Sequence, residues 1–235
     1  MRYRVQVVGW TLIWSGLLVL GYLGWLIFGT DVINSGVQTA ASEKLVGKLA
    51  ASDPTADSVD SDVYLGTTER PEGLPDTVSF YEEGPPAPGD AFGFISIPKI
   101  GVEDVVIYEG VDTATLKNGP GHMPSTPLPG QPGNAVISGH RTTYGRPFFD
   151  LDQIEPGDEI TVETSIGLNT YQVTQLLVVL PTDVWVTDPR PGGWLTLTTC
   201  NPKFSARERL IVFATMVSGP NYDYVRLHEA KFNQT

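Results

Sequence analysis

A single thiol dominates the chemistry that this chain could perform. Cys200 is the only cysteine among 235 residues, and it ends residues 194–200, an alternating run typical of a β-strand. His140 ends a second apolar stretch, and Arg209 begins a third. A thiolate attacks carbonyl carbons, and a neighbouring imidazole is the usual group that generates or accompanies it. If these strand ends meet, the three side chains predict acyl transfer through a thioester.

The residues near the thiol could assist that reaction. The guanidinium of Arg209 could bind a substrate carbonyl or the oxyanion of a tetrahedral intermediate. Thr199 could add a hydroxyl or a backbone donor to the same oxygen, or it could simply be a β-branched strand former. Cys200 and His140 also have ordinary interpretations, as a packing residue and a surface residue at a strand end.

The remaining histidines are weaker candidates for chemistry. His122 lies in a stretch rich in glycine and proline, and we expect it to bond to its own loop. His228 lies in a polar segment and is interpreted as a surface residue. Neither shows the spacing of metal ligands, so no metal site is predicted.

Short strands and turns surround these residues. The 25 glycines and 19 prolines punctuate brief apolar runs, which favours an all-β barrel or sandwich with short helices. Residues 119–134 are expected to be irregular loop, and residues 147–154 a short helix. The eight strands expected are residues 92–97, 104–108, 135–139, 159–163, 168–180, 184–186, 194–200 and 209–217.

An apolar segment near the amino terminus predicts a transmembrane anchor. Residues 5–28 carry no charged side chain, and as a helix they would span about 36 Å, more than the roughly 30 Å of a hydrocarbon core. A cleaved signal peptide would have a shorter apolar core. Arg2 and Arg4 precede the segment and Asp31 follows it. The positive-inside rule therefore places residues 1–4 in the cytoplasm and the catalytic domain outside the cell membrane.

Acidity is concentrated between the anchor and the strands. The net charge is −12, and residues 31–90 hold twelve acidic against three basic side chains. Residues 29–90 therefore predict an acidic extracellular linker that contains a short helix at 37–50. Residues 91–217 form the predicted barrel and residues 218–235 a polar C-terminal tail. No basic stripe exists to neutralise phosphates, which excludes nucleic acid as a partner.

The residues around the thiol resemble those of the sortase family. The shared motifs are Thr-Leu-Thr-Thr-Cys at residues 196–200, Arg209 at the head of the next strand, and Gly-His-Arg at residues 139–141. The block TLTTCNPKFSARERLIV is most similar to class E sortases, the housekeeping type of high-GC Gram-positive bacteria. The likeness covers residues 92–217 and includes further motifs at 95–101, 119–122, 132–134, 148–151 and 157–158.

The resemblance implies a closed eight-stranded β-barrel with His140, Cys200 and Arg209 as its catalytic residues. It implies a transpeptidase that cleaves a Leu-Ala/Pro-x-Thr-Gly sorting signal between Thr and Gly, with Leu-Ala-x-Thr-Gly preferred. The implied partners are secreted proteins bearing C-terminal sorting signals and a peptidoglycan precursor amine. No cofactor is implied. Some sortases bind calcium, but here the corresponding loop offers only Asp183 and Asp188 as carboxylate ligands.

Two features of pilin-polymerising sortases do not occur in this sequence. No Asp-Pro-aromatic lid precedes the barrel and no second apolar span follows it, which favours wall anchoring. Two other functions stay open: an anchored cysteine peptidase or amidase that releases its product to water, and a non-catalytic surface-binding β-domain. An L,D-transpeptidase is disfavoured, because that class places its cysteine in a Ser-x-Gly-Cys context.

Overall fold

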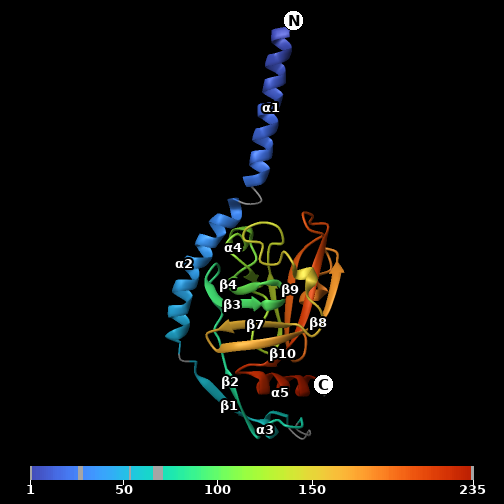
Figure 1. The fold of residues 1–235 in the computed structure, drawn as a ribbon. Helices are drawn as coiled ribbons and strands as arrows, with labels where there is room; N and C mark the ends of the chain where they lie inside the picture. Colours follow the sequence, from blue (N-terminus) through green and yellow to red (C-terminus); the bar gives the residue numbers. More distant parts are fainter. Residues whose placement is uncertain (1, 26–28, 53, 66–70, 234–235) are drawn as a thin grey trace.

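A closed barrel forms the body of the molecule, and the expected all-β barrel is confirmed. The computed structural model describes residues 2–25, 29–52, 54–65 and 71–233 (Figure 1). Eight strands close the barrel in the order β10-β8-β7-β3-β4-β5-β6-β9. These strands are β3 (Ala91–Ile97), β4 (Val102–Glu109), β5 (Gly121–His122), β6 (Gly133–Ser138), β7 (Glu159–Thr164), β8 (Gly167–Val179), β9 (Gly193–Asn201) and β10 (Glu208–Ser218).

Side-chain alternation decides which residues fill the barrel. Leu197 of β9 and Val212 of β10 point inward and belong to the main apolar cluster, which lies inside the barrel. Ile211 and Phe213 alternate with them and pack on the outer face. Short connecting helices lie between the strands: η2 (Pro98–Ile100), α4 (Thr113–Leu116), η3 (Leu151–Gln153) and η4 (Val184–Thr187).

One of the eight strands is not where the sequence predicted it. Residues 184–186 form the 3-10 helix η4, whose Val186 packs against the outer face of β10. Its place in the barrel is taken by β5, which is parallel to β4 and antiparallel to β6. A two-residue strand within a stretch rich in glycine and proline has no alternation to reveal it. The helix predicted at residues 147–154 is shorter, since only η3 forms there.

The amino-terminal helix projects away from the barrel. Helix α1 (Arg2–Gly24) has no buried residue within its apolar span, residues 6–24, and that span is long and apolar enough to cross a membrane (Figure 1). The predicted anchor ends at residues 26–28, which lie outside the described residues.

The described residues between 29 and 90 hold more structure than the acidic linker that the sequence predicted, and the helix expected at 37–50 forms as part of a longer one. Helix α2 (Thr30–Ala50) runs along the side of the barrel (Figure 1). Its Leu45 is buried with Phe94, Val106 and Tyr108 of the barrel wall. The linker expectation was wrong for the parts that dock, because Leu45 is buried against the barrel wall, although Val32, Ile33 and Val46 of the same helix stay exposed.

Two further segments lie at the end of the barrel farthest from α1 (Figure 1). β1 (Ala56–Asp60) pairs with β2 (Thr77–Tyr81), and α3 (Ser61–Leu65) follows β1. The C-terminal residues 218–235 are not only a polar tail, because they form α5 (Tyr222–Phe232). Its Leu227 is fully buried, together with Leu65, Leu74 and Val78.

Candidate active site

Cys200 and Arg209 face each other across two neighbouring strands. β9 and β10 are antiparallel, and Arg209 is the register partner of Cys200. The Cα atoms of such partners lie about 4.5–5.5 Å apart, and their side chains share one face of the sheet. Cys200 is in phase with Thr196 and out of phase with the inward Leu197, so the half-buried thiol belongs to the outer face of the barrel.

His140 reaches the same place from the other side of β9. β6 runs parallel to β9, with Ser138 beside Thr198, and the amide of Gly139 donates to the Thr198 carbonyl at 3.0 Å. β6 ends at Ser138, and the same alternation carried two residues past its end puts His140 level with Cys200 on the same face. Adjacent strands are about 4.8 Å apart. The register therefore brings together the three side chains that the sequence singled out, with the cysteine in the middle.

The imidazole of His140 lies in a shielded setting. Its Nε2 is buried and has no hydrogen-bond partner among the described residues. Its ring centroid lies 5.1 Å from that of Tyr144. Burial lowers the pKa of His140 below its usual range, and the positive charge of Lys117 lowers it further. The neutral imidazole, which can accept a proton, is therefore favoured.

The guanidinium of Arg209 is held by the loop that joins β9 to β10. Its Nη1 donates to the carbonyls of Ala206 and Glu208, both at 3.0 Å. Within the described part of the chain, Nε and Nη2 of Arg209 have no partner, so they can donate to a substrate oxygen. A guanidinium held in this way presents a positive charge beside the thiol without having to reorganise.

The side chain of Thr199 does not point toward the thiol's face, which corrects the expectation for its hydroxyl, while a backbone donor at this position stays a prediction. Thr199 is 3% exposed and its Oγ1 donates to the carbonyl of Gly139 at 2.7 Å. The hydroxyl is therefore committed and cannot serve a substrate oxygen. Instead it ties the end of β9 to the residue that precedes His140.

A buried arginine that sequence reasoning missed links the two strand ends. Arg141 follows His140, and its side chain is only 2% exposed. It donates to the Cys200 carbonyl at 3.3 Å and to Asn201 Oδ1 at 2.8 Å, and it forms an ion pair with Asp152 at 2.9 Å. The Gly-His-Arg motif contained this residue, but nothing in its spacing indicated that it would be buried.

The other two histidines lie away from the thiol. His122 is buried and bonds through Nδ1 to Glu109 at 2.7 Å and through Nε2 to the Pro127 carbonyl at 3.0 Å, which places it in the barrel wall. His228 lies on α5, where burial lowers its pKa. In the residues that the structure describes, no group of three His, Cys, Asp or Glu side chains could hold a metal ion.

The same part of the chain matches a known protein family. The family model described as "Sortase domain" matches residues 95–217, which include every strand end described above. The chain belongs to the sortase family. Sortases are cysteine transpeptidases, and the match spans more than half of the 235 residues.

Individual sortases show how far the similarity extends. Sortase SrtE1 of Streptomyces coelicolor is 37% identical over 55% of this chain, but the match spans only 41% of that protein's length. Sortase D of Bacillus subtilis is 31% identical over 91% of this chain and 99% of its own length. The expected likeness to class E is confirmed by the match to SrtE1 and by the solved structure of a sortase E.

Solved sortase structures share the barrel. Sortase E from Streptomyces avermitilis is 39% identical, with a TM-score of 0.52 over 56% of this chain and 91% of its own. A Clostridium perfringens sortase D5 transpeptidase is 26% identical, with a TM-score of 0.58 over 78% of this chain and 99% of its own.

Proposed function

We propose that this sortase is a membrane-anchored transpeptidase that uses Cys200, His140 and Arg209 as its catalytic residues. The observation that supports the proposal is the strand register: Arg209 is the partner of Cys200, the only cysteine, and β6 runs beside β9 and ends two residues before His140. The substrate is a protein with a Leu-Ala/Pro-x-Thr-Gly sorting signal, and Leu-Ala-x-Thr-Gly is preferred on the likeness to class E.

The first half of the reaction forms a thioester. The neutral imidazole of His140 accepts the thiol proton as the sulfur of Cys200 attacks the threonine carbonyl carbon. The oxygen of the tetrahedral intermediate gains negative charge, which the guanidinium of Arg209 stabilises. The Thr–Gly bond then breaks, and His140 returns the proton to the departing glycine amine.

The second half transfers the acyl group to an amine. A cell-wall peptide amine attacks the thioester carbonyl, the C–S bond breaks, and the thiolate of Cys200 recovers a proton. The product is a protein joined to the wall by a new amide bond. Attack by water at the same step would release the protein and make the chain a peptidase.

The anchor supports this site of action. Residues 6–24 can span a membrane, with Arg2 and Arg4 before them and Asp31 after them. The positive-inside rule then puts the amino terminus in the cytoplasm and the barrel outside, where secreted proteins and wall precursors meet.

Mass spectrometry of the full-length chain in detergent tests the proposal. A peptide containing Leu-Ala-Glu-Thr-Gly should leave a covalent adduct on Cys200, and Cys200→Ala should show none while remaining folded. Adding triglycine as an amine should yield a ligated peptide. Hydrolysed product alone would support the peptidase instead. Binding of the peptide with no adduct and no product, unchanged in Cys200→Ala, would support a binding domain.

A further inference from the structure

The turn that follows His140 has a strained backbone. Tyr144, Gly145 and Arg146 all have positive φ, at 53°, 78° and 47°. For the two residues with a Cβ this conformation costs roughly 1–2 kcal/mol each. Such a turn persists only where its surroundings hold it in place.

Helix α2 supplies those surroundings. The amide of Gly145 donates to Oδ1 of Asp31 at 2.9 Å, and Nε of Arg146 pairs with Oδ2 of the same carboxylate at 2.9 Å. The Tyr144 amide approaches Oγ1 of Thr30 at 3.4 Å. One carboxylate in the first turn of α2 therefore binds two of the three residues with positive φ.

The contact is also close enough to require glycine. A Cβ on Gly145 would lie 2.1 Å from Oδ1 of Asn34. Asn34 is 6% exposed, and its Nδ2 donates to the carbonyls of Lys117 and Asn118, both at 2.9 Å. The first turns of α2 thus bind the turn that follows His140 and the segment that carries Lys117.

Both of these segments contact the imidazole or its neighbour. The Tyr144 ring lies 5.1 Å from the His140 ring, and Nζ of Lys117 lies 5.6 Å from the Tyr144 centroid. Displacing the turn would therefore move the ring that packs against His140.

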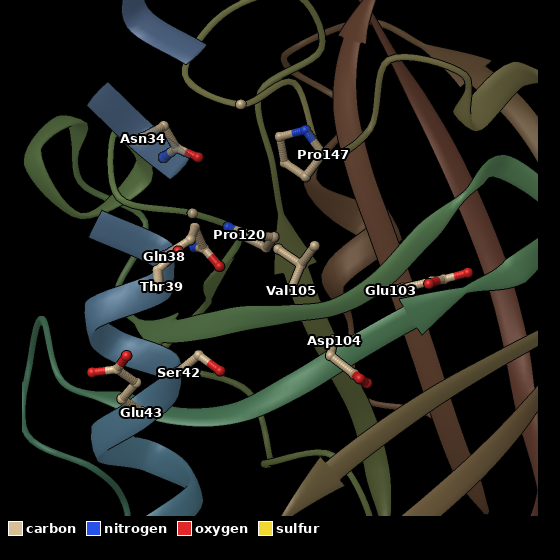
Figure 2. A pocket seen from close by; sticks show the side chains of 12 residues that line it. Asn34, Gln38, Thr39, Ser42, Glu43, Glu103, Asp104, Val105, Pro120 and Pro147 are labelled. Atoms are coloured by element: carbon tan, nitrogen blue, oxygen red, sulfur yellow. The ribbon is translucent and has the colours of Figure 1, made fainter. Parts of the chain in front are cut away.

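Polar bonds, rather than apolar packing, hold this half of α2. A cleft of about 340 Å³ lies between it, β4 and the turn, and Figure 2 shows Gln38 extending from the helix beside Pro120, with Asn34 higher on the same helix. Gln38 bonds to both the amide and the carbonyl of Val106. The apolar contact of α2, at Leu45, lies further along the helix.

We propose that Asp31 is a positioning residue for His140: it fixes the strained turn 144–146, and the turn holds Tyr144 against the imidazole. The segment just after the anchor is then part of the active site, although it lies outside the matched sortase domain. This inference rests on the proposed role of His140.

The test compares Asp31→Ala with Glu43→Ala in the full-length chain in detergent. Glu43 is an exposed acid on the same helix. Cleavage of the Leu-Ala-Glu-Thr-Gly peptide should lose at least about tenfold in kcat with Asp31→Ala, while KM changes less than twofold, because a misplaced catalytic group slows chemistry more than binding. Glu43→Ala should match the wild type in both constants.

A second variant separates positioning from folding. Asp31→Asn keeps an oxygen for the Gly145 amide but loses the charge that pairs with Arg146, so its kcat should lie between those of the wild type and Asp31→Ala, with an unchanged Tm. Wild-type kcat in Asp31→Ala, or a loss confined to KM, would overturn the inference. A wild-type chain that neither cleaves the peptide nor forms the Cys200 adduct would overturn the proposed function instead.

Discussion

Two arginines next to the thiol have opposite environments at the scale of single residues. Arg209 is half-buried and leaves part of its guanidinium open on the face of Cys200. Arg141 is almost fully buried, and its guanidinium donates to Phe149, Cys200 and Asn201 and pairs with Asp152. The first is available for the substrate-binding role proposed for it, whereas the second fixes the spacing between the ends of β6 and β9.

Replacing Arg141 with lysine should disturb both stability and rate. Lysine keeps the charge but cannot reproduce the fork of donors that holds several acceptors at once. We expect the free energy of unfolding to fall by about 2 kcal/mol, since hydrogen bonds to a charged group are lost. We also expect kcat for the sorting-signal peptide to fall about tenfold, because the two strand ends can shift. Urea unfolding and steady-state kinetics measure the two effects.

The matched control for that change is Arg207→Lys. Arg207 is exposed on the neighbouring loop, so this substitution should leave both quantities within error. A loss of stability without any loss of kcat in Arg141→Lys would show that Arg141 braces the fold and does not position the site.

Removing the charge of Lys117 should raise the pKa of His140. Burial is the larger cause of its lowered pKa and remains, so Lys117→Gln should restore only part of the difference. A raised pKa means that the imidazolium persists to higher pH, and the matching limb of the pH–rate profile should move the same way. NMR titration of the imidazole, assigned with His140→Gln, measures the midpoint. Lys99→Gln, a change at a lysine that pairs with Glu155 and Asp158, should leave it unmoved.

At the scale of elements, the site depends on two pairings of different kinds. β9 meets β10 through a short antiparallel connection, whereas it meets β6 through a parallel pairing between segments about 60 residues apart. Parallel strands need a long crossover between them. The loops, η3, β7, β8 and η4 make up that crossover, which is how the end of β6 comes to lie beside β9.

Helix α2 contributes to the stability of the barrel and is more than a spacer. Leu45→Ala should lower the free energy of unfolding by about 2–5 kcal/mol, since it opens a cavity against Phe94 and Val106. Val46→Ala is the control, because Val46 is 56% exposed on the same helix. Equal and small effects from both changes, measured by urea unfolding, would return α2 to the role of a spacer.

At the scale of the whole molecule, the barrel is held close to the anchor. Asp31 comes seven positions after Gly24, the end of α1, and seven residues of chain reach at most about 25 Å. Asp31 in turn binds the loop beside His140. The end of the barrel that carries the candidate active site therefore lies near the apolar helix α1. Figure 1 shows α1 leading into the first turns of α2 at that end of the barrel.

The single cysteine allows the proposed orientation to be tested directly. A membrane-impermeant maleimide applied to intact cells should label Cys200, because the proposed topology puts the barrel outside. In a Cys200→Ala background, Tyr3→Cys should be labelled only after the membrane is permeabilised, since Tyr3 precedes the span and is 78% exposed. The reverse pattern of labelling would invert the proposed topology.

Local periodicity was enough to predict much of this protein. Alternation along residues 194–200 and 209–217 placed Cys200 and Arg209 at adjacent strand ends, because side chains of a strand change face at every residue. The length of the apolar span predicted α1. The two-residue strand β5 and the 3-10 helix η4 were assigned wrongly, since neither segment is long enough to display a period.

The sequence by itself determined the residue types, the strand faces and the family. Only the tertiary structure decided that Arg141 is buried, that the Thr199 hydroxyl bonds to Gly139, and that Asp31 holds the turn after His140. These three features depend on contacts between residues that are 8 to 114 positions apart. A local pattern specifies which face a side chain takes, but the closing of the barrel and the docking of α2 select its partner.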